Sequence, residues 1–171
     1  MTQRKGLPRN RDPARRRPLF REGANAMSME SLLGPDRGPL LACAPDDHLM
    51  TAVSRLVVDG SNAIAVTGPD GQLAGILSDQ DIIRALHAGG GSVGHAKVEN
   101  WMTRNVITVP VDTRLTEAVK LMASHRIRHV VVTGENRKPV AVVGIRAILK
   151  KLHELDEMEI NVLRDMAVAR R

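Results

Sequence analysis

The stretch "GILSDQDIIRAL" at residues 75–86 predicts the end of a strand, one polar turn and a helix that begins at once. Two polar residues three positions apart, Ser78 and Asp81, fall at this junction. Residues 141–152, "AVVGIRAILKKL", have the same apolar frame but carry Gly144 and Ala147 at the matching places. The comparison indicates one supersecondary unit that occurs twice, with the second copy altered.

A shift of the chain by 66 residues aligns 44–86 with 110–152 without a gap, with nine identities in 43 pairs. Each copy predicts a β-α-β-β-α unit. Since one unit of about 45 residues forms a poor core alone, we expect the two to pack with pseudo-twofold symmetry into one α/β globule with two equivalent clefts. The expected elements are strands at Leu40–Cys43, Val106–Val109, 63–67, 72–77, 129–133 and 139–143, helix N-caps at Asp46 or Asp47 and at Asp112 or Thr113, and closing helices at 79–88 and 145–167.

The positive charge is confined to the N-terminus. Residues 1–26 hold eight Lys or Arg against two acidic residues, which accounts for the whole net charge of +6. We interpret this segment as a solvated extension, as sequence upstream of a true start at Met27 or Met29, or as an attachment to RNA, DNA or an acidic partner. The expected division is a disordered basic tail at 1–29, repeat 1 at 30–88, a Gly-rich linker at 89–96, repeat 2 at 97–153 and a helix extension at 154–171.

Several classes of protein are disfavoured. No apolar run approaches the roughly 18 residues of a membrane span, and no signal peptide is evident. The single cysteine, Cys43, favours a reducing cytoplasm, and we expect it to be a buried apolar residue. His125 and His129 have a metal-pair spacing, but a helix gives way to a strand between them, so no metal site is expected. No catalytic motif is present, and we expect no enzyme activity.

Ser78 and Asp81 have two interpretations. A serine at a helix N-cap satisfies a backbone N–H group, and the same helix end attracts an anion. An aspartate one turn later can accept two hydrogen bonds from a vicinal diol. The two residues therefore describe either a cradle for the phosphate and ribose of a nucleotide, or only a helix cap with a favourable first-turn charge.

The residues also carry a family resemblance. Residues 75–81 match the Gly-apolar-x-Ser/Thr-x-x-Asp signature of CBS domains, and "VENWMTRNVITVPVD" at 98–112 and "HRIRHVVVT" at 125–133 match the entry and central strand of a second domain. Over about residues 30–165 the chain resembles a tandem CBS pair, or Bateman module, of a bacterial stand-alone type. Such modules also regulate inosine-monophosphate dehydrogenase, chloride channels and AMP-activated kinase. The resemblance implies phosphate contact by Ser78, ribose contact by Asp81, and a base near Gly75, Ile76, Asn62 and Ala63.

The second copy departs from this signature. Ala141, Gly144 and Ala147 stand in place of its glycine, hydroxyl and carboxylate residues, and the loss of the carboxylate predicts weaker binding. Gln80 in the first copy stands where the resembled subgroup has an arginine. Near the central strand of the second copy, basic side chains are either phosphate contacts of the second cleft or solvated charges: Arg126, Arg128 and His129.

Two functions are compatible with these features. The first is a non-enzymatic sensor that needs no cofactor and binds AMP, ADP, ATP, NAD or S-adenosylmethionine in the first cleft, changing the geometry of a dimer or of an unknown regulated partner. The second is an oligomeric adaptor with vestigial nucleotide sites and a basic tail that contacts nucleic acid. The last helix has an a/d stripe, which predicts a homodimer unless the helix folds back on its own domain: Ile148, Leu152, Leu155, Val162 and Met166, with Glu159 in the one polar slot.

Overall fold

The computed structural model describes residues 26–168, with the side chains of 90–92 and 159–168 left out. Two three-stranded sheets form, in the orders β1-β2-β3 and β4-β5-β6. In each, the first pair of strands is parallel and the second antiparallel. Repeat 1 contains β1 (Ala42–Cys43), α3 (Leu49–Asp59), β2 (Ala63–Thr67), β3 (Leu73–Ser78) and α4 (Asp79–Gly89). Repeat 2 contains β4 (Thr108–Pro110), α5 (Leu115–His125), β5 (His129–Thr133), β6 (Pro139–Gly144) and α6 (Ile145–Val168). The predicted pair of β-α-β-β-α units with a long last helix is confirmed.

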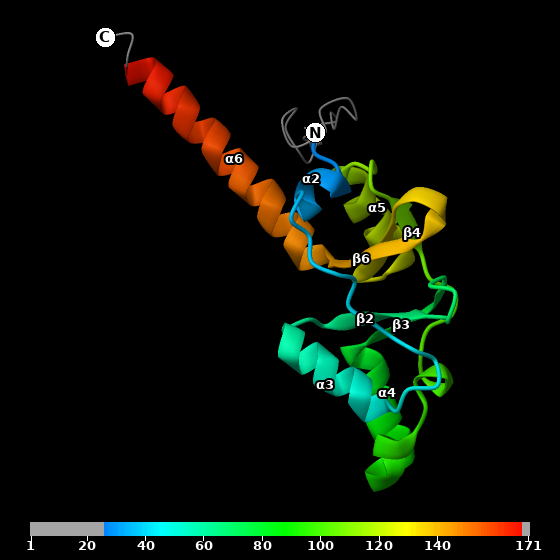
Figure 1. Cartoon of the computed structure of the whole chain (residues 1–171). Helices are drawn as coiled ribbons and strands as arrows, with labels where there is room; N and C mark the ends of the chain where they lie inside the picture. Colours follow the sequence, from blue (N-terminus) through cyan, green and yellow to red (C-terminus); the bar gives the residue numbers. More distant parts are fainter. Residues whose placement is uncertain (1–25, 169–171) are drawn as a thin grey trace, which may run out of the picture.

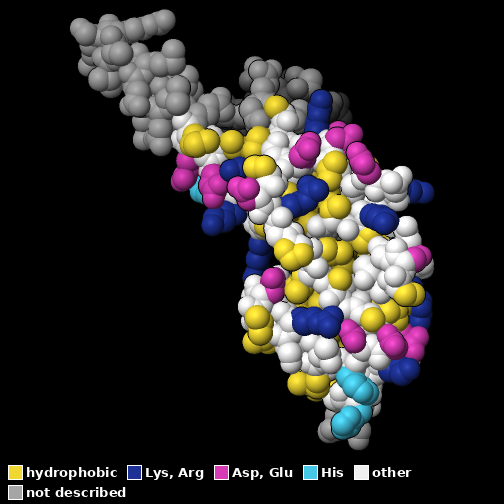
Figure 2. All heavy atoms as spheres, viewed as in Figure 1, with side chains coloured by type: hydrophobic (Ala, Val, Ile, Leu, Met, Phe, Trp, Pro, Cys, Tyr) yellow, Lys and Arg dark blue, Asp and Glu magenta, His cyan; other side chains and the backbone are white. Residues whose placement is uncertain are grey.

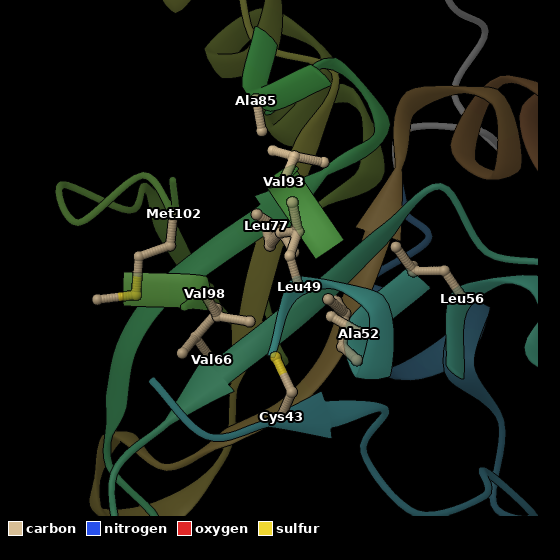
Figure 3. Packing of buried hydrophobic residues seen from close by; sticks show 11 residues of the cluster. Cys43, Leu49, Ala52, Leu56, Val66, Leu77, Ala85, Val93, Val98 and Met102 are labelled. Atoms are coloured by element: carbon tan, nitrogen blue, oxygen red, sulfur yellow. The ribbon is translucent and has the colours of Figure 1, made fainter. Parts of the chain in front are cut away.

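The two sheets pack against each other in the middle of the molecule. Figure 1 shows α3 and α4 on the outer side of one sheet, and α5 on the outer side of the other. A small apolar cluster joins the sheets through Ala63, Ile76 and Val131, which are at most 9% exposed. Each repeat also has its own core between sheet and helices, and Figure 3 shows that of repeat 1, in which Leu49 and Ala52 of α3 lie near Val66 and Leu77.

The segment that precedes each repeat packs on the other repeat. A short helix, α2 (Met29–Leu33), begins at the capping residue Ser28, and Met29 is fully buried in the core of repeat 2. The Met29 N–H donates to Thr113 O at 2.8 Å. Residues 28 and 29, expected in a disordered tail, are therefore ordered, and residues 30–33, expected in repeat 1, belong to a helix that packs on repeat 2. Residues 1–25 of that predicted tail lie outside the described residues.

The second leading segment mirrors the first. Val98 is fully buried in the core of repeat 1, and its N–H donates to Asp47 O at 3.0 Å. The 3-10 segments η2 (Gly90–His95) and η3 (Val98–Asn100) replace the expected free linker, and Val93 joins the same core at 6% exposure. Val93, Val98 and Met102 thus pack in the core of repeat 1, although residues 97–102 lead into repeat 2 along the chain.

The first helix of each repeat begins later than expected. The N-caps are His48 and Arg114, without side-chain capping bonds. Asp47 instead accepts hydrogen bonds from the Ala44 N–H at 3.0 Å and from Arg55 at 3.2 Å. Its carboxylate closes the turn before the helix, which is why Asp46 and Asp47 are not the caps. A third 3-10 segment, η4 (Glu135–Arg137), forms the turn between β5 and β6.

Helix α6 continues beyond the globule (Figure 1). Ile148 and Leu152 are buried in the core of repeat 2, whereas Met158 is 57% exposed. The side chains of Glu159, Val162 and Met166 lie outside the described part of the chain. On the face shown in Figure 2, basic and acidic side chains are interspersed over the described surface. Within residues 26–168, we find no helix with an apolar stretch sufficient to cross a bilayer.

Candidate functional site

The start of α4 has one half of a capping box, in which the residue three positions on accepts the N–H of the serine before the helix. Ser78 precedes the helix, and both its N–H, at 2.8 Å, and its hydroxyl, at 2.6 Å, donate to Asp81 Oδ2. The other carboxylate oxygen of Asp81 pairs with Arg84, and Asp81 as a whole is 3% exposed. This arrangement satisfies an N–H that the helix itself leaves free. Asp81 therefore has a structural role, and a ligand that binds Oδ1 must displace the exposed Arg84 side chain.

The signature glycine has a reason within the fold. The backbones of Ile76 and Thr103 exchange two hydrogen bonds, at 3.0 and 2.9 Å. The crossing segment leaves no room for a side chain on Gly75, because a Cβ there would lie 2.7 Å from Met102 Sδ and 2.9 Å from Thr103 O. Gly75 and Ile76 thus hold the residue 102–103 segment at the edge of β3. Their backbone geometry fixes one wall of the adjoining cavity.

A cavity of about 260 Å³ lies between the start of α4 and the region where α5 gives way to β5. Repeat 1 contributes Ser78, Asp81 and Arg84. Repeat 2 contributes residues that the sequence analysis assigned to the second cleft: Arg126, Arg128 and His129. Arg126 and Arg128 do not line the second cavity, because the start of the central strand in one repeat faces the helix N-terminus of the other across the pseudo-twofold axis. His129 lines both cavities, so its expected place in the second cleft agrees with the structure.

The reverse arrangement forms a second cavity of about 460 Å³. Asn62 and Ala63, which were predicted to line the first site, lie here beside Gly144 and Ala147. A third cavity of about 430 Å³ lies on the pseudo-axis and contains Asp79 and Asn62 from repeat 1 with Arg128 and His129 from repeat 2. His129 lines all three cavities.

His129 has an unusual environment for an ionisable group. Burial lowers its pKa from the ordinary value, and the neighbouring Arg128 lowers it further. The carboxylates of Asp79 and Asp81 act in the opposite direction without reversing the shift. The neutral form of His129 is therefore favoured in the free protein, and an anion in the cavity would favour its protonated form.

The family model for the CBS domain matches residues 35–88 and 98–154, close to the two units seen in the structure. The chain belongs to the CBS-domain family. The CBS-domain-containing protein CBSX3 of Arabidopsis thaliana, a mitochondrial protein, is 32% identical over 122 residues, which cover 68% of this chain and 59% of that protein. The arabinose 5-phosphate isomerase KpsF of Escherichia coli is 32% identical over 58% of this chain and only 30% of its own length. The chain therefore spans less than two thirds of these curated relatives.

Solved structures of CBS-domain proteins are also similar. ATU1752 of Agrobacterium tumefaciens superimposes with a TM-score of 0.68 at 26% identity, and the match covers 78% of this chain and 98% of that chain. The CBS domain pair of protein MJ0100, solved in complex with 5′-methylthioadenosine and S-adenosyl-L-methionine, has a TM-score of 0.64 at 25% identity. That match covers 72% of this chain and 98% of that chain. The predicted family and fold are confirmed.

Some residues that line the cavities were not predicted. Arg84, Thr103 and Asp79 line the cavities but were not assigned to them. The signal for Arg84 was available, because it lies three residues after Asp81 on one helix face. No pattern in the sequence around Thr103 indicated a place in the cavity. Thr103 lies there because the segment before repeat 2 packs against β3 of repeat 1.

Other reactive groups lie away from these cavities. Cys43 is 3% exposed, and burial with the nearby Asp47 raises its pKa to about 11, so the neutral thiol predominates at neutral pH. This confirms its interpretation as a buried apolar residue. Over the part of the chain that the structure describes, His, Cys, Asp and Glu side chains form no cluster of three suited to a metal ion.

Proposed function

We propose that this CBS pair is a regulatory module that binds an adenine nucleotide or adenosyl ligand in the first cavity. The observation that carries the proposal is that a carboxylate residue, Asp81, and two arginines, Arg126 and Arg128, line one space between the repeats. The 260 Å³ cavity alone is small for a nucleotide, but it shares Asp79, Arg128 and His129 with the central cavity of 430 Å³. The adenosyl ligands of the similar MJ0100 pair support the same ligand class.

The ligand acts here by geometry and not by chemistry. Because the first cavity is lined by both repeats, occupancy changes the free energy of one arrangement of the two halves relative to another. A partner protein that contacts both repeats binds one of these arrangements more tightly than the other, so its affinity depends on the ligand. No cofactor is required and no reaction is catalysed. We place the module in the cytoplasm, because a chain with a single cysteine has no intramolecular disulfide that needs an oxidising compartment.

The module acts as a homodimer. Apolar side chains are exposed on repeat 1 at Val57 (75%), Ile83 (63%) and Leu86 (52%), and on α6 at Met158 (57%). A monomer that leaves such surfaces uncovered has more apolar contact with water than one in which a second copy covers them. We assign α6 to the interface because its apolar positions continue after the core of repeat 2 ends.

Isothermal titration calorimetry tests the proposal with AMP, ADP, ATP, NAD, 5′-methylthioadenosine and S-adenosylmethionine. One ligand of this panel is expected to bind per chain and to raise the unfolding temperature. At 100 times its dissociation constant, binding to the folded state stabilises by about 2.7 kcal/mol. A flat response to the whole panel would contradict the sensor and favour the adaptor, whose basic residues 1–26 would then be tested with RNA and DNA.

A further inference from the structure

One arginine of the first cavity has a left-handed backbone conformation, and the equivalent residue of the other repeat is a glycine. Arg126 ends α5 with φ 54° and ψ 37°, in the left-handed region. At the matching end of α3, Gly60 has φ 73° and ψ 17°. A side chain in this region crowds its own backbone, so glycine is the favoured residue for this kind of helix end. Strain of this kind is concentrated at functional sites, and it persists where a side chain has another use.

The two equivalent positions line equivalent cavities. Arg126 lines the first cavity with Arg128, and Gly60 lines the second cavity without a side chain. The second cavity is also the one that lacks the hydroxyl and carboxylate of the signature, at Gly144 and Ala147. The strained arginine thus occurs where the other ligand-binding groups occur.

The charges around Arg126 favour an anion. Asp81 is already engaged by Ser78 and by Arg84. Among the described side chains, neither Arg126 nor Arg128 has a carboxylate partner within salt-bridge distance. Two arginines therefore line the cavity, with Asp79 as the remaining acidic residue. Such a pair matches the oxygens of a phosphate and repels the sulfonium group of S-adenosylmethionine.

We infer that Arg126 is a specificity-determining residue that makes this site select adenosine phosphates over phosphate-free adenosyl ligands. The inference rests on the proposed nucleotide function and narrows its ligand class. Arg126 lines the first cavity just before β5 begins. The ligand phosphate supplies the negative charge that no carboxylate of the described residues supplies to it. The second cavity, with Gly60, does not make this selection.

The test is calorimetric titration of AMP and of 5′-methylthioadenosine, which share an adenosine core and differ in the phosphate. The wild-type protein should bind AMP at least about tenfold more tightly, the value of one charge-assisted contact. Arg126→Gly should remove most of this difference by weakening AMP and leaving 5′-methylthioadenosine unchanged. The same variant should unfold at an equal or higher temperature, because glycine relieves the left-handed strain.

Arg137→Gly is the matched control. Arg137 also has a positive φ, of 59°, and lies in the turn between β5 and β6, outside the first cavity. The Arg137→Gly variant loses the same charge and the same left-handed side chain as Arg126→Gly, but away from the cavity. Its preference for AMP over 5′-methylthioadenosine should therefore equal that of the wild type. Equal wild-type affinity for both ligands, tighter binding of S-adenosylmethionine, or AMP binding unaffected by Arg126→Gly would each overturn the inference and leave nucleotide binding intact. Failure of every ligand to bind the wild type would overturn the proposed function as well.

Discussion

The imidazole of His129 lies in tight contact with the position that a side chain on Gly144 would take. The two residues are register partners in β5 and β6, and a Cβ on Gly144 would lie 3.3 Å from Cδ2 of the His129 ring. In repeat 1 the equivalent partners are Ala63 and Ser78. A small residue thus faces the serine in one repeat, and a large residue faces the glycine in the other. The second cavity is therefore altered by two linked changes and not by the loss of a motif alone.

Restoring the second motif requires room as well as polar groups. Gly144→Ser with Ala147→Asp should leave the stoichiometry at one nucleotide per chain, because the His129 ring remains in place. Adding His129→Ala reproduces the pairing of repeat 1 and should give a second binding event in titration calorimetry. A second event with the double variant alone would show that the ring moves aside, and a triple variant with one event would show that another feature closes this cavity.

Asp81 should contribute to both binding and stability. The sequence alone left ribose recognition and a favourable first-turn charge as the two interpretations of Asp81. In the structure its carboxylate accepts the Ser78 N–H at the start of α4, and the residue is 3% exposed. Asp81→Ala should abolish most nucleotide binding and lower the free energy of unfolding by about 1–3 kcal/mol, because the Ser78 N–H loses its partner. Asp81→Asn keeps an acceptor and should lose binding with a smaller stability change. Urea titration and calorimetry measure the two effects, with the exposed Asp36→Asn as control. Wild-type affinity in both variants would remove Asp81 from the site.

Nucleotide affinity should depend on the protonation of His129. Burial lowers the pKa of His129 in the free protein, so below the ordinary value of about 6.5 the unfolded chain takes up a proton before the folded chain does. The stability of the free protein should therefore fall as the pH is lowered from 6.5 through the lowered pKa. AMP binding should strengthen over the same window, since a phosphate favours the protonated ring. Titrations at several pH values check this, and His129→Ala should flatten the affinity profile while the exposed His87→Ala should not.

The leading segment should stabilise repeat 2. Met29 is fully buried there, and Met29→Ala should lower the free energy of unfolding by about 2–5 kcal/mol. Met50→Ala, at a half-exposed methionine on α3, should have a much smaller effect. Deletion of residues 1–26 ends before this contact and should leave the unfolding temperature unchanged. A large decrease on that deletion would show that the basic segment takes part in the fold.

Assembly should depend on α6. The paired change Leu155→Asp with Val162→Asp should convert the dimer to a monomer in sedimentation analysis, because each buried charge would lack a partner. The side chain of Val162 lies outside the described residues, so this prediction rests on the heptad pattern. Val57→Asp with Ile83→Asp provides the comparison on repeat 1. If only this second pair dissociates the dimer, the interface is formed by α3 and α4 and not by α6.

Much of the fold was present in the sequence. The repeated apolar pattern predicted β2 at Ala63–Thr67 and β5 at His129–Thr133 with their bounds unchanged, and it predicted α4 and α6 to within one residue. Such patterns are local, because a strand or helix with one buried face has a fixed spacing of apolar positions. The junction of Ser78 and Asp81 was likewise predictable, since a helix N-terminus requires a cap.

The tertiary structure alone decided which parts face each other. Met29 and Val98 are each buried in the core of the opposite repeat and donate backbone hydrogen bonds there. The spacing of apolar residues along the chain does not predict such an exchange. The same packing across the pseudo-twofold axis moved Arg126 and Arg128 into the cavity of Ser78, and moved Asn62 into the cavity of Gly144. Spacing along the chain determines the face on which a side chain lies, but the partner of that face depends on how two finished sheets pack.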